Sequence, residues 1–159
     1  MQIYEAGIII GGVPIISANY INPSEKEEDL IHKCALLSCL LNFAETLIAP
    51  IESFESNKYN FAFKKSEINT INSEVIDIFV YLILNKDEKF NKYLDKKIKP
   101  VLDTILDKFK VMYHGRDFSY STQFIKFKDN IDNILLNFKK ILKFQQLGYI
   151  KFDKNKKKK

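Results

Sequence analysis

The chain has 159 residues, of which 46% are hydrophobic and 28% charged, and its formal net charge is +5 at pH 7. This length and apolar content allow one domain with a buried core, which excludes an intrinsically disordered protein. The positive charge is concentrated at one end. Residues 151–159 hold six lysines and one aspartate, so residues 1–150 sum to zero. A neutral domain lacks the basic face that nucleic-acid-binding domains need, and nucleic acid is not an expected partner.

The first elements predicted along the chain are two strands. Residues 2–10 are apolar in both alternating sets except at Glu5, which is typical of a strand covered on both faces. The glycine pair at 11–12 can supply the positive φ of a tight hairpin turn. Residues 13–20 predict the second strand, and Pro14 favours a sheet edge because it has no amide hydrogen to donate. Strict alternation assigns to one face Tyr4, Ala6, Ile8 and Ile10, and to the other Ile3, Gly7 and Ile9.

A long helix is predicted next. Ser24 and Glu27 have the spacing of a capping box, and Pro50 ends the helical pattern, so we expect a helix over residues 25–49. One apolar stripe contains Leu30, Cys34, Leu37, Leu41, Ala44 and Ile48. A second set widens the stripe and contains Ile31, Leu36, Leu40, Phe43 and Leu47. We therefore expect this helix to be buried over more than half of its circumference.

Three further strands are predicted after this helix. Residues 51–56 and 58–65 have the pattern of two strands around a turn, and the second is half-exposed. Residues 66–73 predict a loop. Residues 75–84 predict a central strand that is apolar on both faces except at Asp77, which we expect to reach solvent near the start of the strand.

The last third of the chain has a helical pattern of apolar residues. Residues 87–113 predict a helix with Asp87 as its N-cap, and Pro100 should kink or split it. A final helix is predicted over residues 122–147, with Gly148 as the residue that ends it.

These elements define an architecture with the order β-β-α-β-β-β-α-α. Strands that are apolar on both faces belong in the middle of a sheet, and the proline-bearing and polar strands belong at its edges. The order 2-1-5-4-3 meets these conditions. We expect an α/β (α+β) three-layer sandwich, in which the long helix covers one face of a five-stranded antiparallel sheet and the last two helices cover the other.

Two segments carry a resemblance to a known family. The hairpin GIIIGGVPIISANY and the helical segment LLSCLLNFAETL resemble the opening hairpin and first helix of the longin, or SNARE-like, superfamily, whose relatives include roadblock- and profilin-like domains. The resemblance extends over residues 2–147 and rests on packing patterns. It implies one longin-like domain over residues 1–150 that acts as a binding module, as in vesicle-tethering complexes, coat adaptors, SNAREs and regulators of small GTPases.

No catalytic, cofactor-binding or metal-ligating set is recognised in the sequence. The glycine pair at 11–12 is followed by Val-Pro and not by the Lys-Ser of a phosphate-binding loop. His32 and Cys34 are about 200° apart around a helix, so they cannot share a metal. His32 is expected to face solvent, and His114 lies in a predicted loop. Cys34 and Cys39 are expected as buried, unpaired thiols of a reducing compartment.

The sequence therefore favours a non-enzymatic longin-type adaptor or scaffold without a cofactor. The resemblance implies a small GTPase or another longin- or roadblock-type subunit as its protein partner, and trafficking as a setting. The expected location is cytoplasmic, with a peripheral position at a membrane as an alternative. The alternative function is a three-layer α/β sensor that binds a small ligand between sheet and helices. A closed core without an internal polar cluster would argue against that sensor.

Two segments are candidate contact sites. A homodimer could form at the edge of the third strand, which lacks proline. Its candidate pairing residues are Ile51, Glu52, Ser53, Phe54, Glu55 and Ser56. Residues 151–159 are expected to be a polybasic, disordered tail, with contact to an anionic membrane as an alternative. The candidate membrane-contact residues are Lys151, Lys154, Lys156, Lys157, Lys158 and Lys159.

Overall fold

The computed structural model describes residues 1–139, so the end of the predicted last helix, Gly148 and the six tail lysines lie outside the described residues. The strands are β1 (Ile3–Ile10), β2 (Val13–Asn19), β3 (Ser53–Glu55), β4 (Tyr59–Asn69) and β5 (Val75–Asn85). The helical elements are α1 (Glu27–Leu47), α2 (Phe90–Tyr93), the π-helical turn η1 (Leu94–Ile98), α3 (Lys99–Tyr113), the 3-10 turn η2 (Ser121–Phe124) and a helix that includes residues 127–139.

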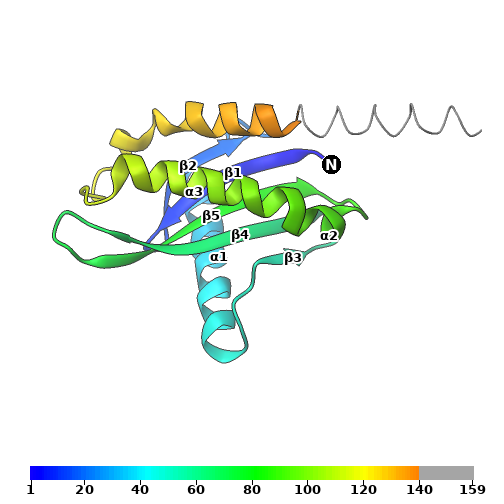
Figure 1. Cartoon of the computed structure of the whole chain (residues 1–159), viewed down its shortest axis with the longest axis horizontal. Helices are drawn as coiled ribbons and strands as arrows, with labels where there is room; N and C mark the ends of the chain where they lie inside the picture. The colour runs from blue at the N-terminus through cyan, green and yellow to red at the C-terminus, as the bar shows by residue number, and fades with distance from the viewer. Residues whose placement is uncertain (140–159) are drawn as a thin grey trace, which may run out of the picture.

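The five strands form one antiparallel sheet in the order β2-β1-β5-β4-β3. Figure 1 shows the three layers, with α1 on one face of the sheet and α3 with the helix over residues 127–139 on the other. The predicted fold class, element order and strand order are therefore confirmed.

The central position of β1 follows from its apolar residues on both faces, but one part of its predicted alternation is wrong. The pairing of β1 with β5 shifts register between Ile3 and Glu5. Such a bulge inserts a residue that reverses the side-chain alternation upstream of it. Ile3 consequently joins the core under α3, and Tyr4 packs on the α1 side of the sheet.

The face of the sheet under α3 holds the larger core. Pro100 interrupts the predicted helix as expected, because the segment divides into α2, η1 and α3 with Pro100 in the first turn of α3. The prediction of Asp87 as N-cap is wrong: Lys89 occupies that position. The Asp87 carboxylate instead accepts a hydrogen bond from the Lys89 amide at 2.9 Å and pairs with the Met1 amino group at 3.0 Å.

Two local predictions fail, one at the start of α1 and one at the end of β4. The capping box at Ser24 is wrong: α1 begins after Lys26 without a side-chain cap, and the Ser24 hydroxyl donates to Asn22 at 3.1 Å. The predicted loop over residues 66–73 is wrong at its start, because β4 pairs with β5 as far as Asn69. Backbone pairing with the central strand β5 overrides the polar side chains of that stretch.

The largest correction concerns α1, which is not buried over most of its circumference. Its buried residues are Cys34, Leu37, Ser38, Leu41 and Ala44, which form a single narrow stripe. The residues expected to widen that stripe are exposed, namely Ile31, Leu36, Leu40, Phe43 and Leu47. Cys39 is also exposed, although it was expected to be buried. A single helix on an open sheet face meets apolar partners on one side alone, and Figure 1 shows the far end of α1 extending away from the sheet.

By length and composition α1 is also apolar enough to cross a membrane, with a mean hydropathy of 1.3 over an 18-residue window. The buried stripe nevertheless packs on β4 and β5 through Phe63, Phe79 and Tyr81. The first turn carries Glu27 together with two more acids, as is common for a helix with a free, solvated N-terminus. We interpret α1 as the covering helix of the sheet with one apolar side left open.

Candidate functional site

A groove of about 600 Å³ opens beside α1 on its face of the sheet. It exists because α1 covers part of this face and no other helix among residues 1–139 covers the rest. Its apolar walls are formed by Tyr4, Ile21, Leu36, Leu37, Leu40, Phe54, Tyr59, Phe61 and Ile83. The polar residues along the groove are Glu5, Asn19, Asn22, Glu25, Lys33 and Ser56.

The wall opposite α1 is aromatic, and the register of the two outer strands creates it. Phe54 of β3 lies directly across from Phe61 of β4, and their rings stack with centroids 4.3 Å apart. Tyr59 packs edge-on against Tyr4 at 5.5 Å. The bulge in β1 contributes to this wall, because it turns Tyr4 to the α1 side. Rigid aromatic rings on neighbouring strands form a wide apolar surface at little entropic cost.

The polar end of the groove is organised by Glu5, which is 4% exposed. Its Oε1 accepts hydrogen bonds from Tyr81 at 2.6 Å and Ser17 at 3.1 Å. Its Oε2 accepts from Lys33 at 2.7 Å and Asn19 at 3.3 Å. A buried carboxylate is tolerated when its lone pairs are satisfied in this way. The apparent break in the pattern of β1 is therefore the centre of a polar cluster that joins β1, β2, β5 and α1.

Lys33 connects this cluster to solvent. Its ammonium also pairs with Glu25 at 2.8 Å, and its side chain is 24% exposed. Burial acts to lower the pKa of Lys33, but its hydrogen bonds to Glu25 and Glu5 outweigh burial and raise the pKa above 10.5. Two carboxylates face one ammonium, so the polar end of the groove carries net negative charge.

The protons of the buried neighbours are firmly held. Burial raises the pKa of Tyr81 well above 10, with further contributions from Cys34 and Glu5. Burial likewise raises the pKa of the Cys34 thiol to about 11, so this thiol is protonated and a poor nucleophile at neutral pH. This arrangement suits recognition of a ligand or partner by fixed charges and apolar contacts.

Gly7 is required by the same cluster. A Cβ at position 7 would meet the Tyr81 ring at 2.5–2.6 Å, closer than non-bonded atoms tolerate. The Tyr81 ring therefore lies directly over the bare backbone of β1, which places its hydroxyl on Glu5.

The edge residues that sequence reasoning selected lie together at the outer edge of the sheet. Ser53–Glu55 form the short outer strand β3, and the Phe54 ring lies in the groove wall. Glu52 pairs with Lys99 at 2.6 Å, and Glu55 pairs with Lys86. Ile51 packs on the core under α1, whereas Ser56 makes the turn to Tyr59. The exposed part of this edge is therefore short and flanked by charge.

The other sequence candidates stand apart from the groove. His32 is exposed, as predicted. His114 is also exposed, as is common for a residue at the end of a helix or in a loop. Asp77 reaches solvent, as predicted, and pairs with Lys65 at 3.3 Å. Within residues 1–139, no three His, Cys, Asp or Glu side chains come close enough to hold a metal ion.

Sequence reasoning missed the groove itself. The sequence of α1 did contain a sign of the groove. Apolar residues occur around more of the helix circumference than one sheet face can bury, so some of them had to remain exposed or meet a partner. Comparison of the chain with protein-family models and with curated proteins found no match, so no family membership is shown.

Proposed function

We propose that this chain is a non-enzymatic, longin-type adaptor that docks an apolar segment of a protein partner in the groove beside α1. The observation that carries the proposal is the groove together with the exposed leucines of α1. Leu36 is 69% exposed and Leu40 is 39% exposed, and both line the groove. Exposed apolar surface of this extent on a folded domain is typical of an interaction site.

The open apolar side continues along α1 beyond the groove. Phe43 and Leu47 follow Leu36 and Leu40 at helical spacing, and both are more than half exposed. An apolar stripe of this kind fits the apolar face of a partner helix or strand. The longin resemblance implies that the partner is a small GTPase or another longin- or roadblock-type subunit.

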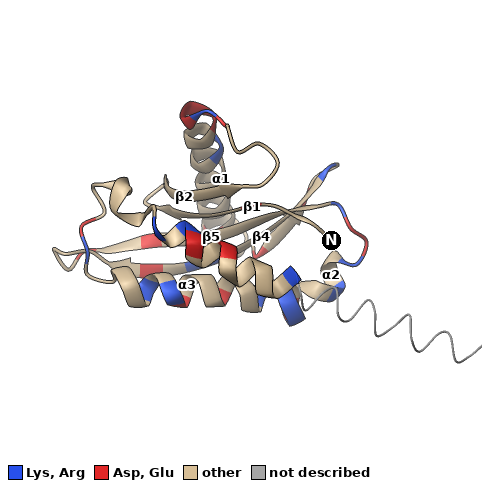
Figure 2. Cartoon of the chain, turned by 90° about the horizontal axis from the view of Figure 1, so that it is seen from above, with Lys and Arg blue, Asp and Glu red and all other residues tan. Residues whose placement is uncertain are grey.

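The charges around the groove favour protein over lipid as the occupant. Figure 2 shows acidic residues gathered at the N-terminal end of α1, where Glu27, Glu28 and Asp29 are exposed. Anionic lipid would be repelled by these carboxylates and by the net negative cluster of Glu5 and Glu25. A protein segment with an apolar face and a basic residue at its end is complementary to both parts of the groove.

A matched pair of double variants tests the proposal. Leu36→Glu/Leu40→Glu places two charges in the groove, and Val111→Glu/Leu136→Glu places two charges on exposed apolar positions elsewhere. Native lysate is passed over each immobilised chain, and small GTPases are tested in both nucleotide states. A partner that the wild type and the control retain, that the groove variant loses, and that rebinds as a purified protein supports the proposal. Identical capture by all three chains contradicts it.

A second candidate function is supported by the polar cluster. A small-ligand sensor needs an apolar site with a few convergent polar groups, and Glu5, Asn19 and Lys33 provide them at one end of the groove. Native mass spectrometry of the freshly purified chain distinguishes the candidates. A bound small molecule that the Leu36→Glu/Leu40→Glu variant lacks would favour the sensor, and a bare chain mass with retained partner capture would favour the adaptor.

A further inference from the structure

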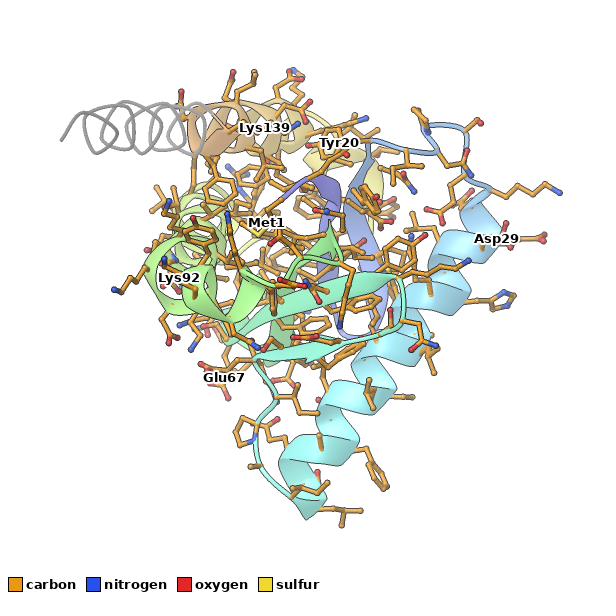
Figure 3. All side chains as sticks on the ribbon, turned by 90° about the vertical axis from the view of Figure 1, so that its right-hand side faces the viewer. Met1, Tyr20, Asp29, Glu67, Lys92 and Lys139 are labelled. Carbon is orange, nitrogen blue, oxygen red and sulfur yellow. The ribbon has the colours of Figure 1, made fainter. Side chains whose placement is uncertain are left out.

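The C-terminal end of α1 forms an apolar tip that stands clear of the sheet. Figures 1 and 3 both show this end of the helix extending past the sheet, and Figure 3 labels Asp29 at the opposite end of the helix. We define the tip as residues 46–50, which are Thr46, Leu47, Ile48, Ala49 and Pro50. All five are exposed, and the exposed fractions of Leu47 and Ile48 are 64% and 81%.

The apolar side chains of the tip take no part in the packing of the domain. Neither core of buried residues, under α3 or under α1, includes a tip residue. Phe43 lies one turn before Leu47 and is also exposed, so it extends the apolar surface back toward the sheet. A single exposed apolar residue is ordinary, but several in sequence on a protruding element are typical of an interaction surface.

The tip is also free of charge. Residues 46–51 contain no charged residue, although 28% of the chain is charged. Glu45 and Glu52, which bound this stretch, each pair with a lysine of the chain. The acids at positions 27–29 lie about 27 Å or more from Leu47 along the helix axis, at about 1.5 Å per residue. Salt screens charges over about 8 Å at physiological ionic strength, so these acids do not repel an anionic surface that meets the tip.

The length of the tip matches a shallow insertion into a membrane. Leu41 is the last large side chain of α1 that is buried on the sheet. Ile48 follows seven positions later, which is about 10 Å along the helix axis. Apolar segments that anchor peripheral proteins enter the boundary between headgroups and acyl chains to a depth of about 5–10 Å. The tip can therefore reach this boundary while the sheet stays outside the membrane.

The backbone of the tip favours a hydrated environment over a dry protein pocket. The amides of Ile48 and Ala49 both donate to the carbonyl oxygen of Ala44 at 2.9 Å. The carbonyl groups that follow in the last turn have no partner within the helix, as at any helix end, and this turn has no basic residue to donate to them. The headgroup layer supplies water to these oxygens, whereas a dry apolar pocket would leave them unsatisfied at a cost in free energy.

We propose that this tip inserts into the headgroup layer of a phospholipid membrane and so places the domain at the membrane surface. Leu47 and Ile48 supply the apolar contact. Few inserted side chains give weak and reversible binding, so a second contact is needed for stable attachment. The lysines of residues 151–159 are the candidate second contact within this chain, because they attract acidic headgroups.

This site is separate from the groove proposed for a protein partner. Leu40 is the groove residue of α1 nearest to the tip, and it precedes Ile48 by about 12 Å along the helix. A membrane at the tip therefore leaves the groove open, and a protein partner can be bound at the same time.

A fluorescent probe at the tip of the full chain tests the proposal. Cys39→Ser removes the exposed thiol, and burial raises the pKa of the Cys34 thiol to about 11, so an added cysteine is labelled selectively. In this background Ile48→Cys and Val111→Cys each carry a nitrobenzoxadiazole dye, and Val111 lies exposed on α3. The vesicles contain three parts phosphatidylcholine to one part phosphatidylserine. We expect a rise in emission of about twofold or more, shifted to the blue, at position 48 and almost no change at position 111.

Charges placed in the tip should weaken binding. Ile48→Asp/Ala49→Asp is compared with Val111→Asp/Leu136→Asp, which adds the same charge at exposed positions on the other side of the sheet. In co-sedimentation with the same vesicles we expect a loss of about tenfold in the first variant and of less than about threefold in the second. Thermal melting by circular dichroism checks that both variants are folded.

Several outcomes would overturn the proposal. A vesicle-bound chain whose emission at position 48 stays constant, or changes as much as at position 111, would assign the contact to another part of the chain. Equal losses in the two charge variants, or absence of wild-type binding, would also reject insertion of the tip.

The test is independent of the adaptor proposal. Ile48→Asp/Ala49→Asp leaves Leu36 and Leu40 intact and should capture a protein partner as the wild type does. Leu36→Glu/Leu40→Glu should lose the partner and still bind vesicles. Loss of partner capture in the tip variant, with no response of position 48 to vesicles, would assign the tip to the protein partner and contradict membrane insertion alone.

Discussion

The two faces of the sheet differ in how completely they are covered. Among the described residues, the core under α3 contains 24 buried hydrophobic residues, and the core under α1 contains eight. On the first face α3 and the helix over residues 127–139 pack side by side, and the rings of Phe109, Phe124 and Phe127 interlock between them. On the second face a single helix leaves aromatic residues of β3 and β4 open in the groove.

Under the proposed function, this difference separates the residues that stabilise the fold from the residues that bind a partner. Burial of apolar surface is the main stabilising contribution in folding, so the α3 face supplies most of it. The α1 face retains enough contact to fix α1 on the sheet while an apolar surface stays open. Substitutions on the two faces should therefore have different consequences for folding and for binding.

The largest effect on stability is expected from a truncation in the core under α3. Phe109 is fully buried and contacts four other aromatic rings, so Phe109→Ala leaves a cavity that its neighbours cannot close. The loss in unfolding free energy should be about 3–5 kcal/mol. Chemical denaturation measures it. A loss as small as that of a surface substitution would contradict the comparison.

A smaller effect is expected under α1, where two neighbouring leucines make a matched pair. Leu37 is 5% exposed and packs on the sheet, whereas Leu36 is 69% exposed. Leu37→Ala should lower the unfolding free energy by about 2–4 kcal/mol, and Leu36→Ala by less than about 0.5 kcal/mol. If denaturation showed equal losses, α1 would be covered on both sides and the groove would be closed in solution.

The pH dependence of stability should contain a contribution from the polar cluster of the α1 face. Cys34, Tyr81 and Lys33 all have a pKa that is higher in the folded chain than the ordinary values of 9.0, 10.0 and 10.5. Each stabilises the fold fully below its ordinary pKa, and that contribution is lost as the pH rises toward the folded value. Between about pH 8 and pH 10.5 we expect a loss of roughly 1–3 kcal/mol.

Denaturation midpoints across this pH range measure the loss. Tyr81→Phe removes one of the titrating groups, so its stability should fall less steeply with pH than that of the wild type. Tyr20→Phe on the other face should also reduce the slope, because burial and Asp132 raise the pKa of Tyr20, and the double variant Tyr20→Phe/Tyr81→Phe should combine the two reductions. Stability that is flat up to pH 10.5 in the wild type would contradict the network.

The smallest effect is expected at the sheet edge. Pairing of β3 between two copies would add the few backbone hydrogen bonds of a three-residue strand, each worth about 0.5–1.5 kcal/mol. Glu52 directly precedes β3 and Glu55 is its last residue, and both are already paired with lysines within the chain. We expect weak self-association, visible by light scattering only at high micromolar concentration. A strict monomer there would remove the edge as a dimer contact, and Phe54→Lys should abolish any dimer formed through it.

The fold could be predicted because it depends on the order of apolar, polar and proline residues along the chain. Two-sided apolarity places β1 and β5 in the centre, and Pro14 places β2 at an edge. The groove was not predictable in the same way, because a helical stripe shows which residues are apolar and does not show whether a partner covers them. Leu36 and Leu40 have the same pattern as buried leucines, and the width of the sheet beneath α1 decides their exposure.

The polar cluster depended on contacts that sequence spacing does not encode. Glu5 meets Tyr81 across 76 positions and Lys33 across 28. The bulge that turns Tyr4 into the groove is a register shift between strands distant in sequence. Each of these features depends on which strands and helices lie next to one another in the folded sheet, and the spacing of residues along the chain does not determine that.

The π-helical turn at Leu94–Ile98 has a consequence for how this chain can change length. A π-helical turn is equivalent to an α-helix with one residue inserted. Deletion of one residue there would remove the extra residue and leave a regular helix, in which α2 and α3 keep nearly the same faces toward the core. Phe90, which is 1% exposed, would then stay buried. The same deletion within α3 would instead rotate the residues on one side of it by about 100° and turn part of the buried stripe to solvent. The π-helical turn is therefore the position in this helical segment at which the loss of one residue should be tolerated best.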